Sequence, residues 1–546
     1  MKLTTVGKYL INRLTEIGIK TLFGVPGDFN LEFLDDVLDN ENISWIGNTN
    51  ELNAAYSADG YARLNGIGAF LTTFGVGELS AINGVAGSYS EDVPVIHIVG
   101  TPKKSDIEKQ FILHHTLGTG CDYDAFKKMY EKVTKEAVWL DHKNASNQID
   151  NAIRSAVLYK KPVYIMLPSD ISKLEILDNE KPLSFSSSFD ENENNEIINY
   201  VTKRIEKSKH AVIISGHKVL RYGLVNEIEK LANNLNINVT TTPFGKSSFN
   251  ESNDLFLGIY AGENSLDKSI PKLVNNADLL IIIGNKFTDL TSSFFNLKFD
   301  KNAVVEITDN YVKYEDKVFT NHSFGLIIKT LANKKIKYNG LSVFDEKQND
   351  FFYPVDNAIT YDRFTSALSE FIREDDIFVS DLGTCSFAAQ YIKLKKNVSF
   401  LMQPLWASIG FSFPASIGAK IAFSNRRVIN IIGDGAFNMT LNEIGTAINK
   451  RIGIITFVIN NQGYTIERII NGPEQEYNDI PQVNYSELVK VFDPQGINSI
   501  SYRVTTEIEL QKALQETLDI NNKFIMIEVC IDKFDSPKSL KNGLFK

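Results

Sequence analysis

The sequence predicts an α/β protein of three doubly wound domains with mostly parallel sheets. Apolar runs rich in β-branched residues alternate with amphipathic stretches at helical spacing, a pattern typical of strand–helix–strand units. Most of these runs are followed within a residue or two by Gly, Pro or Asn, which marks the end of a strand and the start of a loop. We expect buried strands at Thr21–Val25, Ala69–Thr72, Val95–Val99, Val163–Met166, Ala211–Ile214, Leu279–Ile283, Val428–Ile432, Ile454–Ile459 and Phe524–Val529.

Two stretches without periodicity divide the chain. At 546 residues it is too long for one ordinary core. The polar stretch Asp178–Glu196 is interpreted as a linker, and Lys334–Asn357 also lacks a pattern. They separate three blocks, roughly 1–180, 190–335 and 355–546. The first and third share a strand–turn–helix plan, visible when Pro94–Gly100 is compared with Arg427–Gly433, which suggests duplication.

Composition narrows the class of protein. The apolar share of 43% and the charged share of 23% are typical of a globular protein in water. A net charge of −10 without a basic stripe argues against a nucleic acid or an anionic membrane as partner. The cysteines Cys121, Cys385 and Cys530 lie far apart without metal-ligand spacing, which favours free thiols in a reducing compartment. With no signal segment and no apolar run of membrane-spanning length, we expect a cytoplasmic protein.

Polar oxygen donors follow two strands of the third block. The strand Val428–Ile432 leads into Gly433-Asp434-Gly435-Ala436, and a helical stretch is expected from Thr440 to Lys450. The next strand ends at Asn460-Asn461, followed by Gly463 and Tyr464. Mg²⁺ prefers carboxylate, amide and backbone oxygens, usually beside phosphates. Asp434, the Asn461 side chain and the Gly463 carbonyl would supply three ligands, and glycines let backbone N–H groups approach a diphosphate at a helix N-terminus.

Gly-Asp-Gly alone would favour an ordinary strand–helix–strand turn. Asn461, however, follows Asp434 by 27 positions, and the combination resembles the thiamine-diphosphate motif. A dinucleotide site would instead need a third glycine where Asn438 stands, so NAD is disfavoured.

The first block contains a glutamate, Glu51, at a position suited to contact the pyrimidine of thiamine diphosphate. Glu51 follows a strand and opens a helix rich in small residues. By itself it would be an acid that stabilises the helix N-terminus. A carboxylate beside the pyrimidine of thiamine diphosphate is also what holds that ring in its reactive imino form.

Longer stretches carry a resemblance over essentially the whole chain. The sequence resembles the pyruvate, indolepyruvate and branched-chain 2-oxo-acid decarboxylase family. The matching segments are Phe23–Asn30, Asn50–Arg63, Thr73–Gly84, His114–Leu117, Gln403–Gly410, Tyr464–Arg468 and Tyr477–Pro481.

The resemblance implies a cofactor, thiamine diphosphate with Mg²⁺, held by the first and third domains. Glu51 would address the pyrimidine, Ile409 would wedge between the two rings, and the Ala407 carbonyl would accept from the pyrimidine amine. Such enforced proximity is worth effective molarities of about 10⁵ M or more. Metal ligands would be Asp434, Asn461 and Gly463. Further cofactor contacts would come from Thr384, Ser408, Gly433, Gly435, Ala436, Tyr464, Thr465 and Ile466.

The resemblance also implies a proton-handling set. Asp28, His114, His115 and Glu467 match the family's two acids and paired histidines. Taken singly, each has an ordinary interpretation, as a turn aspartate, surface or core histidines, or a helix-surface acid. Decarboxylation through a thiamine C2 carbanion and an enamine needs a proton delivered after CO₂ leaves and another removed as the aldehyde departs. Groups whose pKa values are pushed apart suit that relay.

Two further expectations follow from the resemblance. The site forms between subunits, with Glu51, Asp28 and the histidines from one chain and the Asp434–Asn461 loop from the other, so a dimer is required and a dimer of dimers is plausible. The substrate pocket is expected to include Asp28, His115, Leu382, Ser386 and Glu467.

The expected substrate is a 2-oxo acid with a bulky side chain. Ser386 aligns where pyruvate-preferring relatives carry a tryptophan, and a small residue there leaves room for indole-3-pyruvate, phenylpyruvate or branched 2-oxo acids. If this alignment were shifted by one position, Phe387 instead of Ser386 would correspond to the tryptophan. Leu382 stands where many relatives carry Gln, and the end of the chain soon after Pro537 suggests a shortened helix over the pocket.

Three other functions stay open. One is pyruvate decarboxylation. Another is a carboligase of the acetolactate-synthase type, which commonly lacks the paired histidines and often holds FAD in its middle domain. Ile213–His217 and Ile281–Asn285 resemble Rossmann strand ends but carry no dinucleotide fingerprint. The third is a non-catalytic regulator that binds the cofactor, which the joint presence of Glu51, His114, His115 and Glu467 argues against.

Overall fold

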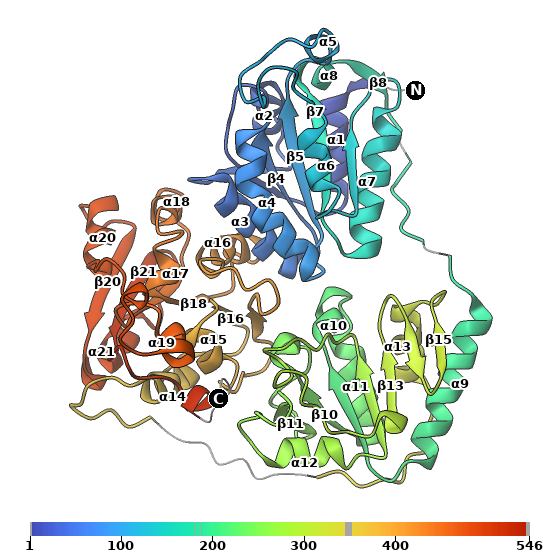
Figure 1. Ribbon diagram of the computed structural model, residues 1–546, viewed down its shortest axis with the longest axis vertical. Helices are drawn as coiled ribbons and strands as arrows, with labels where there is room; N and C mark the ends of the chain where they lie inside the picture. Colours follow the sequence, from blue (N-terminus) through green and yellow to red (C-terminus); the bar gives the residue numbers. More distant parts are fainter. Residues whose placement is uncertain (1–2, 180, 187, 344–351, 542–546) are drawn as a thin grey trace.

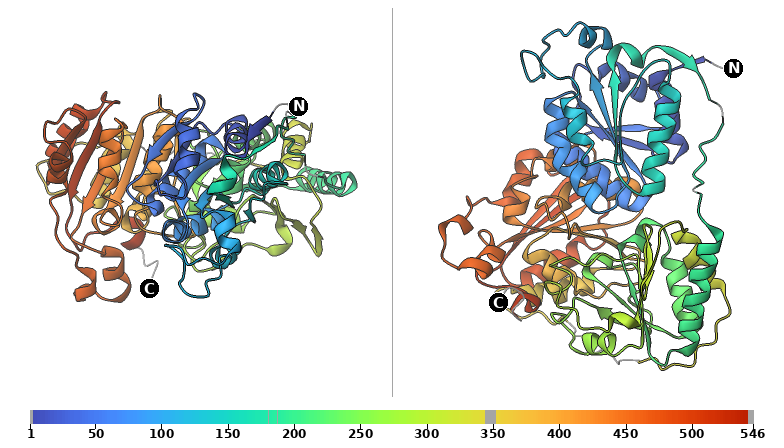
Figure 2. Two further views of the ribbon diagram at one scale, coloured as in Figure 1. Left: turned by 90° about the horizontal axis from the view of Figure 1, so that it is seen from above. Right: turned by 45° about the vertical axis from the view of Figure 1, so that its right-hand side comes forward.

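The computed structural model describes residues 3–179, 181–186, 188–343 and 352–541, which form three α/β domains. They appear as three lobes coloured blue to cyan, green to yellow and orange to red (Figures 1 and 2). Between the first and second lobes, the described residues 181–186 and 188–190 run along the outside of the molecule. Within the described residues, no helix is both long enough and apolar enough to cross a membrane.

The first domain is a six-stranded parallel sheet in the order β3-β2-β4-β5-β7-β6. Its central strands β4, β5 and β7 are buried along their whole length, because helices cover both faces of a parallel sheet. A short antiparallel pair, β1 with β8, lies beside it. The elements are β1 Leu3–Thr5, α1 Val6–Glu16, β2 Thr21–Gly24, α2 Leu31–Leu38, β3 Ser44–Gly47, α3 Glu51–Asn65, β4 Gly68–Thr73, α4 Val76–Ser90, β5 Val95–Thr101, α5 Lys104–Glu108, α6 Ala125–Tyr130, β6 Glu136–Trp139, α7 Ala145–Tyr159, β7 Val163–Pro168, α8 Ser169–Ser172 and β8 Glu175–Leu177.

The middle domain has a seven-stranded sheet, β11-β10-β9-β12-β13-β14-β15. Its first five strands are parallel in the Rossmann order, and β14 and β15 add an antiparallel edge. The elements are α9 Glu191–Lys207, β9 Ala211–Ser215, α10 His217–Arg221, α11 Val225–Leu235, β10 Asn238–Thr241, η1 Pro243–Gly245, β11 Phe256–Ile259, α12 Ser269–Asn275, β12 Leu279–Ile283, η2 Lys301–Ala303, β13 Val304–Ile307, β14 Val312–Tyr314, β15 Lys317–Phe319 and α13 Phe324–Asn333.

The third domain repeats the architecture of the first, with a parallel sheet in the order β17-β16-β18-β19-β21-β20. The elements are α14 Tyr361–Phe371, β16 Ile377–Ser380, α15 Thr384–Ala389, β17 Ser399–Leu401, α16 Ser412–Ala422, β18 Val428–Gly433, α17 Asp434–Phe437, α18 Glu443–Asn449, β19 Ile455–Asn460, α19 Thr465–Asn471, η3 Glu476–Asn478, α20 Tyr485–Phe492, β20 Ser499–Val504, α21 Glu507–Thr517, β21 Phe524–Cys530 and α22 Lys538–Lys541.

The strand order supports duplication of the first and third domains. It also shows that Pro94–Gly100 and Arg427–Gly433, which were compared in the sequence, are not equivalent segments. Numbered by their appearance within each domain, the strands of the first and third sheets both follow the order 2-1-3-4-6-5. By this order β18 corresponds to β4. The segment Pro94–Gly100 instead covers β5, the fourth strand, so its likeness to Arg427–Gly433 reflects shared burial rather than equivalent positions.

The expected strands are present with boundaries that differ by at most two residues, whereas two other expectations need correction. The linker expected up to Glu196 ends earlier, because α9 begins at Glu191 and the Asp190 side chain caps it by accepting from the Asn192 N–H. The helix expected over Thr440–Lys450 begins only at Glu443. In the second patternless stretch, residues 344–351 lie outside the described residues, and the described remainder contains no helix or strand.

The first and third domains of the chain are joined by a close helix crossing. α3 and α16 occupy equivalent places in their domains and pack against each other (Figure 1). An added Cβ at Gly60 would lie 2.1 Å from the Ala415 carbonyl oxygen, and one at Gly418 would lie 1.8 Å from the Ser57 carbonyl oxygen. Only glycine permits this approach of backbone to backbone.

We predict that Gly418→Ala destabilises the protein by about 3 kcal/mol, because the new methyl group must displace the α3 backbone. Gly325→Ala is the matched control, since Gly325 lies in α13 and, beyond its chain neighbours and its own helix backbone, no atom lies within 4 Å of the added Cβ. It should be neutral or slightly stabilising. Urea unfolding monitored by circular dichroism measures both; equal midpoints for the two variants would contradict the crossing.

Candidate functional site

The carboxyl ends of β18 and β19 bring three oxygens together. The strands are parallel neighbours, so Asp434 and Asn461, which directly follow them, meet at one edge of the sheet. The Asn461 amide oxygen lies 3.2 Å from Asp434 Oδ1 and 3.0 Å from the Gly463 carbonyl oxygen. Asp434 is held in place by N–H donors of Gly435 (2.7 Å) and Gly463 (3.1 Å).

This spacing fits a magnesium ion. Three acceptors facing one another have no proton to share, so they repel until a cation lies between them. In an octahedron with metal–oxygen bonds of about 2.0–2.1 Å, neighbouring ligands lie about 2.9 Å apart. The three ligands predicted from the sequence therefore have the chemistry that Mg²⁺ requires, and the two distances from the Asn461 oxygen are close to the separation of neighbouring ligands.

A hydroxyl group fixes the orientation of the Asn461 amide. Thr465 Oγ1 donates to the Lys533 carbonyl oxygen (3.0 Å) and accepts from Asn461 Nδ2 (2.8 Å). Rotating the amide by 180° would give its nitrogen two acceptors, but would place its oxygen against Thr465 Oγ1, whose proton already serves Lys533. Thr465 thus keeps the amide oxygen directed at the cation position, as outer ligands of metal sites commonly do.

Asp434 is almost completely buried, and its burial raises its pKa to about 6. The surrounding N–H donors lower the pKa without cancelling that effect. A carboxylate so placed stays ionised at neutral pH most readily beside a positive charge, which a divalent cation supplies.

A cavity of about 280 Å³ opens beside these oxygens. It joins residues from the ends of three parallel strands, where ligands of open α/β sheets bind. Most of the predicted cofactor and substrate residues line it, with Gly383 and Cys385 in addition. The predicted residues in the lining are Leu382, Thr384, Ile409, Gly433, Asp434, Gly435, Ala436, Asn461, Gly463, Tyr464, Thr465, Ile466 and Glu467.

Tyr361 in α14 extends this polar network, and sequence reasoning missed it. Its hydroxyl is 2.5 Å from Thr384 Oγ1 and accepts from Asn461 Nδ2 at 3.4 Å. The side chain is fully buried. Nothing in the local sequence distinguishes it from a core tyrosine, because both partners come from other parts of the chain.

The loop with Ala407, Ser408 and Ile409 reaches the cavity through Ile409. Ala407 has φ 62°, a left-handed conformation that costs a non-glycine residue free energy and is held by its surroundings. Ser408 does not line the cavity; its Oγ lies 2.6 Å from the Tyr56 hydroxyl and accepts from Asn83 Nδ2 at 3.1 Å. The Ser408 side chain therefore anchors this loop to the first domain, and its predicted cofactor contact stays a prediction.

Asp381, also missed, holds the other end of this loop. It directly follows β16 and is buried, and its carboxylate accepts from the N–H groups of Gly410 (3.0 Å) and Ser412 (2.8 Å). Burial raises its pKa to about 6. Asp381 could have been found from the sequence, since it is an acid directly after a buried strand, as Asp434 is.

A second cluster lies in the first domain. Asp28 Oδ2 and His114 Nε2 are 2.7 Å apart, and both side chains are more than half exposed. The ligand-type atoms of Asp28, His114 and His115 all lie within 4.8 Å of one another. Phe29 stacks on the His114 ring, and His115 has a left-handed backbone at φ 66°. The adjacent histidines thus face one aspartate instead of pointing apart.

Glu51 begins α3, and the Asn50 side chain caps that helix. An added Cβ at Gly77 would lie 3.2 Å from Glu51 Oε1, so the start of α4 lies against the carboxylate. The preceding residue Thr49 is bound by Glu443 of the third domain through its N–H (2.8 Å) and hydroxyl (2.6 Å). Glu443 is a further missed residue, since its partners lie almost 400 positions away.

Within one chain the two clusters remain separate. The cavity at Asp434 is lined only by third-domain residues, and Glu51, Asp28, His114 and His115 do not reach it. The part of the third domain that meets the start of α3 is Glu443, not the Asp434–Gly463 loop.

Ser386 also lies outside the lining. It is buried, and its hydroxyl donates to the Gly383 carbonyl oxygen at 2.8 Å. The neighbouring Phe387 packs with Leu540 of α22, Ile466 and Ile469. Leu382 and Cys385 are the side chains of this segment, besides Thr384, that line the cavity.

Three family models match the chain. They describe the N-terminal thiamine pyrophosphate (TPP) binding domain of thiamine pyrophosphate enzymes (residues 4–126), the central domain (198–325) and the C-terminal TPP binding domain (381–529).

Similar proteins cover nearly the whole chain. Pyruvate decarboxylase isozyme 3 of Saccharomyces cerevisiae is 35% identical over 98% of this chain and 97% of its own length. The alpha-keto-acid decarboxylase of Mycobacterium leprae is also 35% identical, over 98% of this chain and 94% of its own. A Rhodococcus jostii thiamine diphosphate-dependent 4-hydroxybenzoylformate decarboxylase shares the fold, with a TM-score of 0.79 at 20% identity over 97% of this chain and 99% of that chain.

We predict that Thr465→Val lowers the affinity for the metal roughly 10- to 100-fold, because the Asn461 amide can then rotate its oxygen away. Thr465→Ser keeps the hydroxyl and should keep most of the affinity. Electron paramagnetic resonance of Mn²⁺, measured without thiamine diphosphate, reports the metal alone. Equal affinity in the Val and Ser variants would remove the role assigned to the hydroxyl.

Proposed function

Because the chain belongs to the thiamine-diphosphate-dependent 2-oxo-acid decarboxylases, we propose that it converts 2-oxo acids with bulky side chains into aldehydes and CO₂. The oxygens of Asp434, Asn461 and Gly463 carry this proposal, since they would bind the cation that anchors a diphosphate; the Asn461 oxygen lies 3.2 Å from Asp434 Oδ1 and 3.0 Å from the Gly463 carbonyl oxygen. The reaction consumes one proton for each CO₂ released, so the site must also deliver protons.

The third domain would hold the cofactor. Asp434, Asn461 and the Gly463 carbonyl would bind Mg²⁺, and the residues at the start of α17 line the same cavity, where their N–H groups would meet the diphosphate. When bound, thiamine diphosphate supplies the nucleophilic carbon and the electron sink for loss of CO₂. Ile409 would set the orientation of the cofactor's rings, and the Ala407 carbonyl would accept from the pyrimidine amine.

The remaining side chains would handle protons. Glu51 would hold a proton at the pyrimidine ring. The Asp28–His114 pair is already within hydrogen-bond distance, and His115 and Glu467 would complete the set that delivers a proton to the aldehyde carbon and removes one from its oxygen.

We infer a dimer, because the proposed chemistry needs Glu51 and Asp434 in one site. Exposed apolar side chains flank both clusters: Val76 and Leu79 at the start of α4, and Trp406 and Met439 beside the Ala407–Ile409 loop. Apolar surface of this kind favours a protein partner. A second copy of the chain would cover it and bring the two half-sites together, and a dimer of dimers would leave that site unchanged.

The lining supports a preference for bulky substrates. Leu382, Cys385 and Ile466 give the cavity an apolar wall, and Phe387 is directed toward Leu540 instead of filling it. Indole-3-pyruvate, phenylpyruvate and branched 2-oxo acids would bury their side chains against this wall.

The shared site can be tested by mixing two inactive variants. Glu51→Gln and Asp434→Ala should each lose activity by orders of magnitude. If the site is shared, a mixed dimer has one site with both changes and one intact site, so refolding at equal amounts restores about a quarter of wild-type activity. The assay couples aldehyde to alcohol dehydrogenase and NADH. Activity in Glu51→Gln alone would contradict its role, and no recovery on mixing would contradict the shared site.

Substrate preference can be tested with Leu382→Trp. We expect kcat/KM for phenylpyruvate to fall at least about tenfold, with that for pyruvate changing little, because the indole takes the space of the larger side chain. Ser386→Ala, outside the lining, is the control and should change neither value. A wild-type enzyme with higher kcat/KM for pyruvate than for phenylpyruvate, 3-methyl-2-oxobutanoate and indole-3-pyruvate would overturn the preference; acetolactate as product would indicate a carboligase.

A further inference from the structure

Glu78, in the first turn of α4, is a fully buried acid outside the proposed proton-handling set. Its side chain reaches back to the start of the helix, where one carboxylate oxygen accepts from the Gly75 N–H at 2.6 Å. A glutamate at the third helical position commonly makes this bond. A glutamate is, however, rarely buried completely unless a cation pairs with it.

Aromatic residues surround the carboxyl group of Glu78. The Tyr164 hydroxyl of β7 donates to its second oxygen, and the Tyr130 hydroxyl of α6 donates to the Glu78 carbonyl oxygen at 2.5 Å. The two tyrosine rings stack with their centroids 4.2 Å apart, and the buried ring of His97 contacts both. Burial lowers the pKa of His97 well below its usual value, so this ring adds no positive charge.

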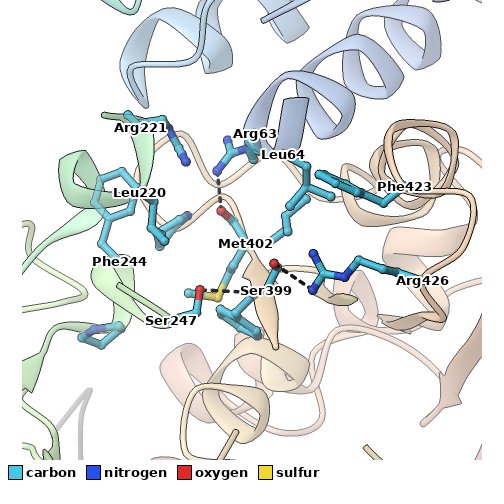
Figure 3. A pocket seen from close by; sticks show the side chains of 14 residues that line it. Arg63, Leu64, Leu220, Arg221, Phe244, Ser247, Ser399, Met402, Phe423 and Arg426 are labelled. Atoms are coloured by element: carbon cyan, nitrogen blue, oxygen red, sulfur yellow. Dashed lines mark hydrogen bonds between the residues drawn. The ribbon is translucent and has the colours of Figure 1, made fainter. Parts of the chain in front are cut away.

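Glu78 differs in this respect from other buried acids of the first domain. Asp59 and Glu91 both pair with Arg63, which also donates to the Met402 carbonyl oxygen at 2.9 Å (Figure 3). Among the described residues no cation lowers the pKa of Glu78, and burial raises it from 4.5 to about 7. Its two donors favour the ionised carboxylate while its burial disfavours it. A local conflict of this kind is typical of functional sites.

The turn that Glu78 holds lies against two members of the proton-handling set. Gly75 has φ 68°, and an added Cβ there would lie 2.3 Å from the His115 carbonyl oxygen. Two residues later, an added Cβ at Gly77 would lie 3.2 Å from Glu51 Oε1. A displaced turn would therefore move the backbone that supports both Glu51 and His115.

We propose that Glu78 is a positioning residue, which fixes the turn Gly75–Gly77 and through it the placement of Glu51 and His115. The two donors need an acceptor at each oxygen, which an ionised carboxylate provides and an amide does not. The inference rests on the proposed function, because that function gives Glu51 and His115 their roles.

The turn itself can be tested on the full chain without cofactor, by hydrogen exchange measured with mass spectrometry. The amides of residues 74–78 should exchange at least about tenfold faster in Glu78→Gln, because glutamine cannot accept from both Gly75 and Tyr164. Glu509→Gln is the matched control and should leave this segment unchanged. Glu509 is the third-position glutamate of α21, accepts from the N–H groups of the preceding turn, and is exposed.

The consequence for the site is measured on the holoenzyme, as exchange of the C2 proton of bound thiamine diphosphate with D₂O, followed by NMR. Glu78→Gln should slow this exchange at least about tenfold, because Glu51 is no longer aligned with the pyrimidine. The cofactor should bind about as tightly as to wild type, since the metal loop is unchanged. Tyr164→Phe should slow the exchange several-fold, and the double variant should be no slower than Glu78→Gln, because the two side chains act as one unit.

Stability separates a positioning residue from a purely structural one. At pH 8 Glu78→Gln should unfold within about 5 °C of wild type, since removal of a buried charge whose pKa is raised to about 7 offsets the lost hydrogen bond. A larger drop would make Glu78 structural and overturn the inference. Unchanged amide exchange, unchanged C2 exchange, or multiplied losses in the double variant would overturn it as well. A wild-type holoenzyme whose C2 exchange is no faster than that of free thiamine diphosphate would instead overturn the proposed function, and this inference with it.

Discussion

The repulsion among three oxygens at the ends of β18 and β19 is the constraint on which the proposed chemistry depends. The Asn461 amide oxygen lies 3.2 Å from Asp434 Oδ1 and 3.0 Å from the Gly463 carbonyl oxygen. Hydrogen bonds from the Gly435 and Gly463 N–H groups to Asp434 and from Asn461 Nδ2 to Thr465 hold these oxygens in place, since the oxygens do not attract one another. Burial raises the pKa of Asp434 to about 6, so the isolated chain disfavours the charge that the site needs. A divalent cation removes both penalties at once, which is why these positions make sense as a metal site and not as an ordinary strand–helix turn.

The duplicated fold explains why one chain holds two different half-sites. Both sheets have the strand order 2-1-3-4-6-5, so the loops that follow the carboxyl ends of equivalent strands lie at equivalent places in the two domains. At the end of β18 that edge carries Asp434; at the end of β4 it carries Thr73, Phe74 and Gly75, without a metal ligand. The first domain instead carries its chemistry at Asp28, Glu51 and the histidines. The contact between α3 and α16 uses Gly60 and Gly418 to join the domains closely, yet it places Glu443, and not the metal loop, at the start of α3.

Sequence reasoning succeeded where the information is local. Buried parallel strands are apolar and β-branched whichever position they occupy, so their ranges were predicted closely, and the acids and amides directly after them identified Asp434 and Asn461. The same uniformity made β5 and β18 look equivalent when they are not. Residues whose partners lie far along the chain, such as Glu443, Asn83 and Tyr361, had no local signal. Whether the Ser386 and Ser408 hydroxyls line the cavity depends on their side-chain rotamers, which the sequence does not determine; in the structure they bond Gly383 and Tyr56.

Besides the apolar packing of α3 on α16, charged groups help set how the domains meet. Asp92 of the first domain bonds His217 and Lys286 of the middle domain, and Lys246 with Glu251 ties the middle domain to Ile392 and Leu394 of the third. Such bonds are directional, so they specify position more than they add stability. Glu91 belongs to the same set: it pairs with Arg63 and accepts from the N–H groups of Leu405 and Trp406. The loop with Ala407 and Ile409 is therefore held by Glu91 of the first domain on its N-terminal side and by Asp381 on its C-terminal side. The placement of the domains and the shape of the loop with Ala407 and Ile409 therefore depend on the same contacts, those of Glu91.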